Sequence, residues 1–507
     1  MARNEAAEPI ETVDHVVIGA GSAGCAATYR LSEGGASVCV LEAGPSERHP
    51  LVKVPFGLVF LIGSKQRDWS RRSAPMTALG GRSIGVPRGR MVGGSGSINS
   101  MVWFRGRASD WDAWDVPGWA WSDMEGVFEA VESHVRPGRL PHPHALTEAF
   151  GRLAGANDPE RPPTPERESA GVVHVNMENG ARRSAADAFL RPAMKSGRVR
   201  LMTGAPVERI AIENGRARGA VLRDGRFIEA RAGVLLAAGA IESPMILMRS
   251  GVGAADHLRE HGLGVALDAP GIGANLHDHP GVGLHFDGGP GYGLTLDQAP
   301  AWLASPFAWL FGRRGRLTSN TVEGGAFWRV TPGDGPPEVQ THFIPFLLDP
   351  GGRRTATGTG LFADICLCQP RSRGRLSLSD PHTPHIDLNL LDDPRDLEIM
   401  VRGIERLRRE LSRLDLGDAG EVVPGPDVTG DALAEDIRAR CGTAYHPVGT
   451  VALNGPLDER GSLRGVEGLH VADASVMPRI TSANTNAPSM AIGWRIGGWA
   501  ARTGTRA

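Results

Sequence analysis

The sequence predicts a mixed α/β protein, and three stretches of the chain support that prediction. A strand–turn–helix–strand pattern spans residues 13–42, segments with period-two alternation fill the middle, and a strand, a loop and a helix occupy residues 469–500. Strands that alternate with helices indicate a parallel sheet, whereas consecutive strands joined by turns indicate an antiparallel one. We therefore expect two sheets of different kinds in one chain.

The first stretch is a βαβ unit of about 30 residues. His15–Ile18 is a short apolar strand, residues 25–31 have helical spacing, and residues 36–41 form a second strand that ends at Glu42. Apolar runs of this length, separated by a glycine-rich turn, are typical of two parallel strands connected by a helix.

Between the first strand and the helix, Gly19, Gly21 and Gly24 form the pattern Gly-x-Gly-x-x-Gly. Such glycines allow a tight turn, close approach of a pyrophosphate and close packing of helix on strand. The N-terminus of the helix then offers free N–H groups to phosphate. Glu42 follows Gly24 by 18 residues, near the position of an acid that binds ribose hydroxyls. The pattern predicts a dinucleotide site and disfavours NADP, but it leaves NAD and FAD open.

The middle of the chain is expected to be mostly antiparallel. Residues 207–236 contain three strand-like runs separated by Asn214-Gly215 and Asp224-Gly225, which are typical hairpin turns. Period-two alternation predicts further strands of an antiparallel sheet, at residues 338–343, 363–368, 375–378 and 385–389.

Three other segments complete the expected organisation. Residues 136–167 are rich in Pro, His and Gly, so we expect a loop there. Residues 395–414 are amphipathic and charged, which indicates a surface helix. A strand at residues 469–473 and a helix at residues 489–500 return the chain to the strand–turn–helix pattern.

Composition excludes several classes of protein. Of the 507 residues, 41% are hydrophobic and 22% are charged, which is ordinary globular usage. The net charge of −2 argues against nucleic acid as a partner. No run of about 18 apolar residues occurs, so we expect no membrane span. The polar first residues and the odd number of cysteines, five in a long chain, predict a cytoplasmic protein with no metal centre.

Five longer segments resemble the glucose–methanol–choline (GMC) oxidoreductases. They lie in the order found in that family and, with the glycine motif, extend from residue 13 to about residue 500. The first begins at Gly89 and continues to Arg105-Gly106, and the second covers residues 239–253. The others are the turn at residues 271–279 and the C-terminal segments at residues 445–450 and 473–488.

The resemblance implies FAD and a fold of two domains. One is a Rossmann-like FAD-binding domain, and the other is a substrate-binding domain built on an antiparallel sheet of about six strands packed with helices. We expect the FAD-binding domain to comprise residues 1–135, 200–285 and 440–507. The substrate-binding domain is then residues 136–199 and 286–439.

The residues at which this chain matches the family's flavin-contacting positions, together with the glycine motif, form the predicted cofactor site. They are Gly19, Gly21, Ser22, Ala23, Gly24, Glu42, Ala43, Gly93, Gly94, Ser95, Asn99, Ser100, Met101, Val102, Val207, Ala238, Gly239, Asp473, Ala474, Asn484, Thr485 and Asn486. For Asp473 the residues themselves leave a second reading open, in which its carboxylate only caps a helix.

The reaction implied is oxidation of an alcohol by hydride transfer to the flavin. Such a reaction needs a base for the hydroxyl proton, and histidine titrates near neutrality. His446 matches the family's catalytic histidine and is the predicted base. Asn484 matches the second catalytic position, where an amide would bond the substrate hydroxyl. Tyr445, His446 and Asn484 are therefore the predicted substrate contacts.

Two positions bear on the variety of enzyme. In the choline-oxidase branch a histidine before the matching asparagine carries a covalent bond to FAD, whereas this chain has Ile98, so non-covalent FAD is expected. Tyr445 matches an aromatic residue that helps to cage a trimethylammonium group. Further candidates for such a cage are Trp69, Trp103, Trp328 and Glu323.

The function expected is oxidation of a small primary alcohol to an aldehyde, with O₂ or a quinone-type compound as electron acceptor. The alternative is a lyase of the same fold, of the cyanohydrin-cleaving type, in which the flavin is structural. A binding module that has lost its chemistry and an NAD dehydrogenase are less consistent with His446, Asn484 and the two flavin signatures. The substrate, the electron acceptor and the oligomeric state stay open.

Overall fold

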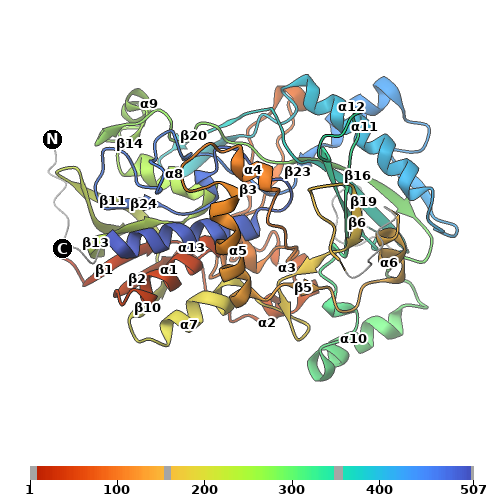
Figure 1. Ribbon diagram of the computed structural model, residues 1–507, viewed down its shortest axis with the longest axis horizontal. Coiled ribbons are helices and arrows are strands. Elements are labelled where there is room, and N and C mark those ends of the chain that lie inside the picture. Colours follow the sequence, from red (N-terminus) through yellow and green to blue (C-terminus); the bar gives the residue numbers. More distant parts are fainter. Residues whose placement is uncertain (1–7, 154–160, 348–357, 504–507) are drawn as a thin grey trace.

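Two large sheets of unlike kind lie toward opposite ends of the long axis of the molecule (Figure 1). The structure is a computed structural model, and it describes residues 8–153, 161–347 and 358–503. The mixed α/β class with one Rossmann-like sheet and one antiparallel sheet is confirmed.

The first sheet has seven strands in the order β10-β2-β1-β13-β12-β11, and β24 pairs with β13. The parallel part of this sheet includes the βαβ unit. In the antiparallel part, the predicted hairpin turns at Asn214-Gly215 and Asp224-Gly225 connect β11 to β12 and β12 to β13. The strands are β1 (Glu11–Ile18), β2 (Val38–Glu42), β10 (Val199–Thr203), β11 (Val207–Glu213), β12 (Arg216–Leu222), β13 (Phe227–Leu236) and β24 (Leu469–Val471).

Helix α1 (Ser22–Glu33) of the βαβ unit packs against α13 (Asn486–Thr503), which comes from the other end of the chain (Figure 1). Small residues allow this close approach. A Cβ atom at Gly493 would lie 2.1 Å from the carbonyl oxygen of Ala23, and one at Gly497 would lie 2.7 Å from the Cα of Ala27. The contact brings the start of α13 beside the glycine turn.

The second sheet is antiparallel and has seven strands, one more than the sequence resemblance implied. Its order is β22-β16-β19-β18-β17-β6, and the short β23 pairs with β16. The strands are β6 (Ser169–Val172), β16 (Pro280–Asp287), β17 (Gly324–Trp328), β18 (Val339–Ile344), β19 (Gly360–Leu367), β22 (Gly420–Val423) and β23 (Gly442–Thr443).

Two expectations about the middle of the chain need correction. β20 (Arg375–Asp380) and β21 (Thr383–Asp387) form a hairpin of their own outside the large sheet. The stretch expected as a loop at residues 136–167 contains α6 (Ala145–Gly151), because the Nδ1 atom of His144 accepts the N–H of Leu146 and caps the helix. An apolar helix, α10 (Ala299–Gly312), follows the loop that begins at Pro290.

The remaining helices cover the two sheets, and α11 confirms the amphipathic surface helix. Among the described residues, no helix has both the length and the apolar character needed to cross a bilayer. The bounds are α2 (Pro50–Lys53), α3 (Leu58–Leu61), α4 (Ala108–Asp112), α5 (Trp121–Val135), α7 (Arg191–Met194), α8 (Gly239–Arg249), α9 (Ala255–Glu260), α11 (Pro394–Leu411) and α12 (Gly430–Arg440).

Short strands and single helical turns account for most of the other ordered segments. The strands are β3 (Arg71–Arg72), β4 (Gly85–Val86), β5 (Gly138–Arg139), β7 (His174–Val175), β8 (Met177–Glu178), β9 (Ala181–Arg182), β14 (Val252–Gly253) and β15 (Leu267–Asp268). The helical turns are η1 (Pro55–Gly57), η2 (Thr77–Leu79), η3 (Gly94–Ser97), η4 (Ala186–Leu190), η5 (Arg316–Thr318) and η6 (Ala474–Val476).

Candidate active site

A cavity of about 1020 Å³ extends from the glycine turn of the first sheet to the face of the second sheet. Its lining includes every residue of the predicted cofactor and substrate sites except Gly24 and Gly93. Those two lie just behind the wall. A Cβ at Gly24 would come within 2.0 Å of the carbonyl oxygen of Gly19, so Gly24 is needed for the close packing of helix on strand.

The glycine turn leaves room on the cavity side of its backbone. A Cβ atom at Gly21 would meet no protein atom closer than 4.0 Å, so the absence of a side chain there serves the cavity and not the packing of the protein. Gly94 approaches from the opposite wall with a φ of +54°, and a Cβ there would lie 2.8 Å from the Cα of Gly21. Two glycine segments thus form a narrow backbone cradle.

The cradle offers hydrogen-bond donors that suit an anion. The first turn of α1 carries no acidic residue and no side-chain cap, and it begins at Ser22 on the cavity wall. The hydroxyl of Ser22 donates to Oδ1 of Asn486 at 2.7 Å. Among the described residues, the buried Nδ2 of Asn486 has no hydrogen-bond partner. A pyrophosphate at this point would receive N–H groups from both the helix end and this amide.

Glu42 and Asp473 also line the cavity, but both carboxylates already hold the backbone. Glu42 accepts the N–H groups of Ala20 and Gly44, at 3.1 and 2.8 Å, and burial raises its pKa. Asp473 caps η6 through the N–H of Ser475 at 2.8 Å and accepts a 2.6 Å bond from the hydroxyl of Ser243. A carboxylate has further lone pairs, so Glu42 could still accept ribose hydroxyls.

The first GMC-like segment is held by an arginine that the sequence analysis missed. Arg182 on β9 is buried and donates to Oδ1 and the carbonyl oxygen of Asn99 at 2.7 and 2.6 Å, and to the carbonyl oxygen of Gly96 at 3.0 Å. Burial lowers the pKa of Arg182 to about 9. Arg182 therefore fixes both the side chain and the backbone of Asn99 in the cavity wall. No motif marks Arg182 in the sequence.

His446 and Asn484 meet at the second-sheet end of the cavity, as expected for a catalytic pair. Nδ2 of Asn484 lies 3.2 Å from Nε2 of His446, and both residues line the cavity. Oδ1 of Asn484 accepts a 3.0 Å bond from Nε2 of Gln340 on β18, which turns the Asn484 amide nitrogen toward the histidine.

His279 fixes the tautomer of His446. Nε2 of His279 lies 3.1 Å from the carbonyl oxygen of Cys368, which can only accept, so Nε2 carries a proton. Burial lowers the pKa of His279 to about 3, so the ring is neutral and its Nδ1 has a lone pair. That Nδ1 lies 3.1 Å from Nδ1 of His446, which must therefore be the donor. The lone pair of His446 is left on Nε2, at the cavity.

The charge state of His446 follows from its surroundings. Burial, and then the neighbouring His279, His342 and Arg88, lower the pKa of His446 well below its ordinary value. The imidazole is therefore neutral at neutral pH, and the lone pair of its Nε2, which accepts the amide N–H of Asn484 here, can take up a proton when a substrate hydroxyl replaces that contact. A single directed hydrogen-bond chain, from Asn484 to the backbone of Cys368, holds the ring in that state.

The loop that carries His446 is strained and firmly held. Tyr445 has a φ of +68°, which is uncommon for a bulky residue. The hydroxyl of Thr443 accepts the N–H of Tyr445 at 2.8 Å and donates to the carboxylate of Asp278. The other oxygen of Asp278 accepts the N–H of His446 at 2.8 Å. Burial raises the pKa of Asp278 to about 6.

A histidine and an aspartate of the second sheet line the cavity beside Asn484. His342 on β18 and Asp364 on β19 lie 3.0 Å apart, and Nε2 of His342 lies 3.5 Å from Oδ1 of Asn484. Burial disfavours a charged imidazole, but the carboxylate of Asp364 outweighs burial and raises the pKa of His342. The alternation of strand residues was visible in the sequence, but which face meets the cavity was not.

The side chains considered as candidates for an aromatic cage do not come together. Trp69 lines the cavity, but the guanidinium groups of Arg71 and Arg90 lie 4.9 Å from the centre of its ring. Trp103 and Trp328 are buried in the main core and do not line the cavity. The carboxylate of Glu323 is buried and accepts hydrogen bonds from Ser319, Thr147 and the backbone of His144.

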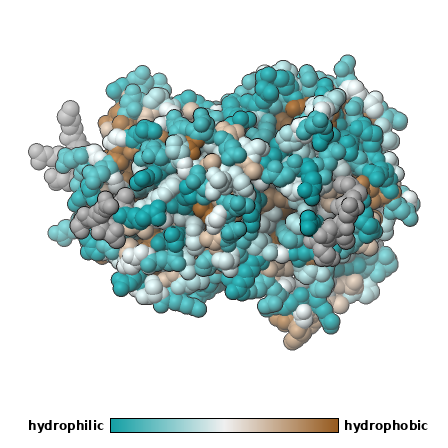
Figure 2. All heavy atoms as spheres, viewed as in Figure 1, coloured by the Kyte–Doolittle hydropathy of each residue, from teal (hydrophilic) through white to brown (hydrophobic). Residues whose placement is uncertain are grey.

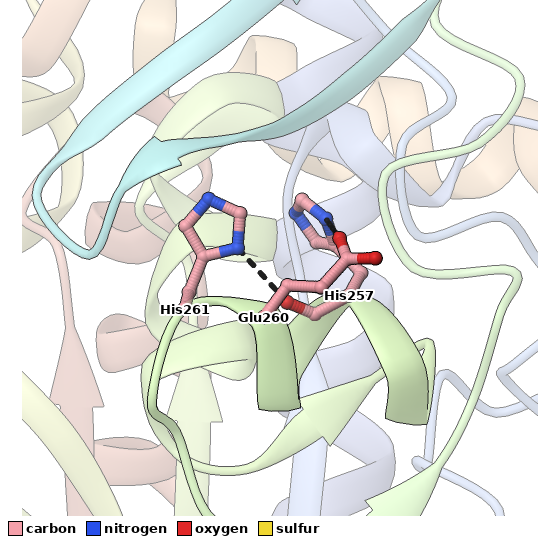
Figure 3. Close-up of side chains that lie close together, drawn as sticks. All are labelled: His257, Glu260 and His261. Carbon is pink, nitrogen blue, oxygen red and sulfur yellow. Dashed lines mark hydrogen bonds and ion pairs between the residues drawn. The ribbon is translucent and has the colours of Figure 1, made fainter.

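Two groups of side chains among the described residues have the composition of metal ligands. One is His342, Asp364 and Cys366 in the cavity wall, and the other is His257, Glu260 and His261 at the end of α9 (Figure 3). In the second group, Nε2 of His257 accepts the N–H of Leu378 at 3.0 Å. The neutral ring therefore carries its proton on Nδ1, which points at Glu260, so this atom is a donor and not a metal ligand.

Comparison with known proteins identifies the family. A GMC oxidoreductase model for the N-terminal part matches residues 13–281, and one for the C-terminal part matches residues 370–493. An alcohol dehydrogenase [acceptor] from Pseudomonas putida is 34% identical over 94% of this chain and 94% of its own length. An oxygen-dependent choline dehydrogenase from Sinorhizobium medicae is 36% identical over 95% of this chain and 94% of its own length.

Solved structures have the same fold. Pyridoxine 4-oxidase from Mesorbium loti superposes with a TM-score of 0.83 and 26% identity, over 96% of this chain and 98% of that one. A formate oxidase superposes with a TM-score of 0.86 and 22% identity, over 97% and 99% of the two chains, which shows the fold alone.

These matches and the site define the class of protein: an FAD-dependent oxidoreductase that acts on CH–OH donors. More narrowly, the chain belongs to the GMC oxidoreductase family. The residues present fit FAD, because the open cavity side of Gly21, the uncapped start of α1 and the unpaired amide of Asn486 are all suited to a pyrophosphate.

Proposed function

We propose that the protein oxidises a small primary alcohol to an aldehyde, with His446 as general base, Asn484 holding the alcohol oxygen, and N5 of a non-covalently bound FAD accepting the hydride. The observation that supports this proposal is the lone pair on Nε2 of His446, fixed by the chain through His279. Nε2 accepts the hydroxyl proton, and the amide of Asn484 donates to the oxygen on which negative charge develops.

A polar alcohol suits the substrate end of the cavity better than a purely aliphatic one. His342 and Asp364 present polar groups beside Asn484, and Tyr445 also lines the cavity. A substrate that carries a second polar group could form a hydrogen bond with these side chains. A hydrocarbon chain would remove them from water and offer no hydrogen bond in return. All five cysteines are free and buried, which supports the proposed location in the reducing cytoplasm.

The test is an anaerobic absorbance spectrum of the purified holoenzyme, titrated with choline and with an aromatic, a furan, an aliphatic and a sugar alcohol. Bleaching of the flavin band by one alcohol would support the reaction and identify the substrate class. Rapid recovery of the band in air would indicate that O₂ is the acceptor, whereas slow recovery would indicate a quinone-type acceptor. If no alcohol bleaches the band but a cyanohydrin is cleaved, the lyase replaces this proposal.

A further inference from the structure

Helix α10 (Ala299–Gly312) is apolar on every side and yet stands outside the body of the protein. In Figure 1 it projects at the lower right, and in Figure 2 the same place is one of the brown areas of an otherwise largely hydrophilic face. Its single hydrophilic side chain, Ser305, is buried and donates to the carbonyl oxygen of Ala301 within the helix. A helix without a polar face is normally covered, in a protein core or by lipid.

The inner face of α10 is firmly attached. Nε1 of Trp302 donates to the carbonyl oxygen of Gly293 at 2.9 Å, and Nε1 of Trp309 donates to that of Gly180 at 2.8 Å. The ring of Trp302 also packs against Phe56 and Phe346, with ring centres 5.5 and 5.9 Å apart. These contacts fix which side of the helix faces outward.

The outward side is a stripe of large apolar residues. Positions spaced three and four apart lie on one face of a helix, and here they are Leu303, Phe307, Leu310 and Phe311, with 75%, 66%, 58% and 81% of their surface exposed. Leu296, in the loop before the helix, is 94% exposed. Single exposed apolar residues are ordinary, but a contiguous group of this kind marks an interaction surface.

The charge at the C-terminal end of this stripe is positive. Asp297 is exposed just before the helix, but residues 298–319 contain no aspartate or glutamate, and three arginines follow the helix. The guanidinium of Arg313 lies 3.9 Å from the centre of the Trp309 ring, and that of Arg316 lies 4.9 Å from the centre of the Trp302 ring. Arg313 and Arg314 are exposed at the end of the stripe. An occupant of this surface must be apolar at its centre and anionic at its edge.

We propose that α10 docks on an anionic lipid surface, with the Leu303–Phe311 stripe in the acyl boundary and Arg313 and Arg314 against headgroup phosphates. The helix has 14 residues, about 21 Å at 1.5 Å per residue, so it cannot cross a bilayer but has the length of an interfacial segment. The two exposed arginines lie together at the C-terminal end of the helix, where they can meet headgroup phosphates, and the exposed Asp297 lies before its other end.

The test is sedimentation of the holoenzyme with vesicles of phosphatidylglycerol and phosphatidylcholine, against vesicles of phosphatidylcholine alone. We expect binding to the anionic vesicles that weakens as salt is added. The variant F307S/F311S should weaken it roughly 100-fold, from the loss of two exposed aromatic anchors. The variant R313Q/R314Q should weaken it roughly 25-fold, at about 1 kcal/mol for each basic residue.

The matched control is Val422→Ser, which removes an exposed apolar side chain on β22. It should bind vesicles like the unchanged protein, and all variants should keep their flavin absorbance and turnover. Binding that is absent, or equally lost in the control, would overturn the proposal. So would a dimer, detected by light scattering without lipid, that F307S/F311S abolishes, because a second copy would then be the occupant.

Discussion

The two ends of the cavity are built in different ways. At the nucleotide end, Gly19 and Gly21 lie in the turn between β1 and α1, and Gly24 lies in the first turn of α1. At the catalytic end, the hydrogen-bond chain joins His279, Cys368, His446 and Asn484, which come from four separate segments. A backbone cradle depends on local conformation, whereas a directed proton acceptor depends on partners that only the folded sheet brings together.

The largest effect should come from the catalytic end. The variant His446→Ala removes the proton acceptor and should slow flavin reduction by alcohol roughly 10²- to 10⁴-fold, the usual contribution of a general base. The nucleotide end lies apart from this change, so FAD should stay bound. Anaerobic stopped-flow absorbance measures the rate, and near-normal reduction would exclude His446 as the base.

A smaller loss tests the chain behind the base. The variant His279→Phe removes the acceptor that holds the proton on Nδ1 of His446, so Nε2 no longer has a fixed lone pair. We expect a fall in kcat of roughly 10²-fold, by analogy with the loss of tautomer control in other histidine catalysts. The control is Cys368→Ala, which keeps the backbone carbonyl that His279 uses. Equal losses in both variants would mean that only packing had changed.

The nucleotide end can be tested with two glycines of the same motif. The variant Gly21→Val places atoms in open cavity space and should weaken FAD binding roughly 10- to 100-fold, since overpacking costs about 1–3 kcal/mol. The apoprotein should keep its melting temperature. By contrast, Gly24→Val meets the carbonyl oxygen of Gly19 and should lower the melting temperature itself. Full flavin occupancy in Gly21→Val would disprove the placement of the pyrophosphate.

The pH dependence of activity distinguishes the two ends of the cavity, because it depends on the catalytic end alone. The base must be unprotonated, and the pKa of His446 lies below its ordinary value of 6.5. Activity should therefore persist as the pH falls through 6.5 and be lost only in more acidic solution. The profile of kcat/KM for the free enzyme measures this limb. A midpoint at or above pH 7 would show that another group controls the step.

The subtlest test concerns the way in which FAD is held. Ile98 lines the cavity and has no nucleophilic atom, so acid denaturation should release all of the yellow colour into the supernatant. Absorbance of the pellet and of the supernatant after centrifugation measures the distribution. Colour that stays with the precipitated chain would reveal a covalent bond at another residue.

Most of the nucleotide end could be predicted because its signals are contiguous. The strand, the glycine turn, the helix and Glu42 follow one another within residues 11–42, and each depends on local geometry. His446 and Asn484 could also be predicted, since each lies in a segment that resembles a family motif. His279 was visible only as part of a turn, and Gln340, His342 and Arg182 carried no signal, because ordinary strand residues reveal neither their face nor their partner.

The sequence by itself determined the βαβ unit, the glycine turn and the hairpins of β11 to β13, because short-range periodicity and turn chemistry govern them. The two proposed catalytic positions came from the resemblance of their segments to the family. Only the tertiary structure decided that β20 and β21 leave the large sheet, that Trp103 and Trp328 are buried in the core, and that α10 stands exposed. It also decided where the proton of His446 resides. The physical reason is that a hydrogen bond between distant segments depends on sheet register and burial, and neither can be inferred from a short stretch of sequence.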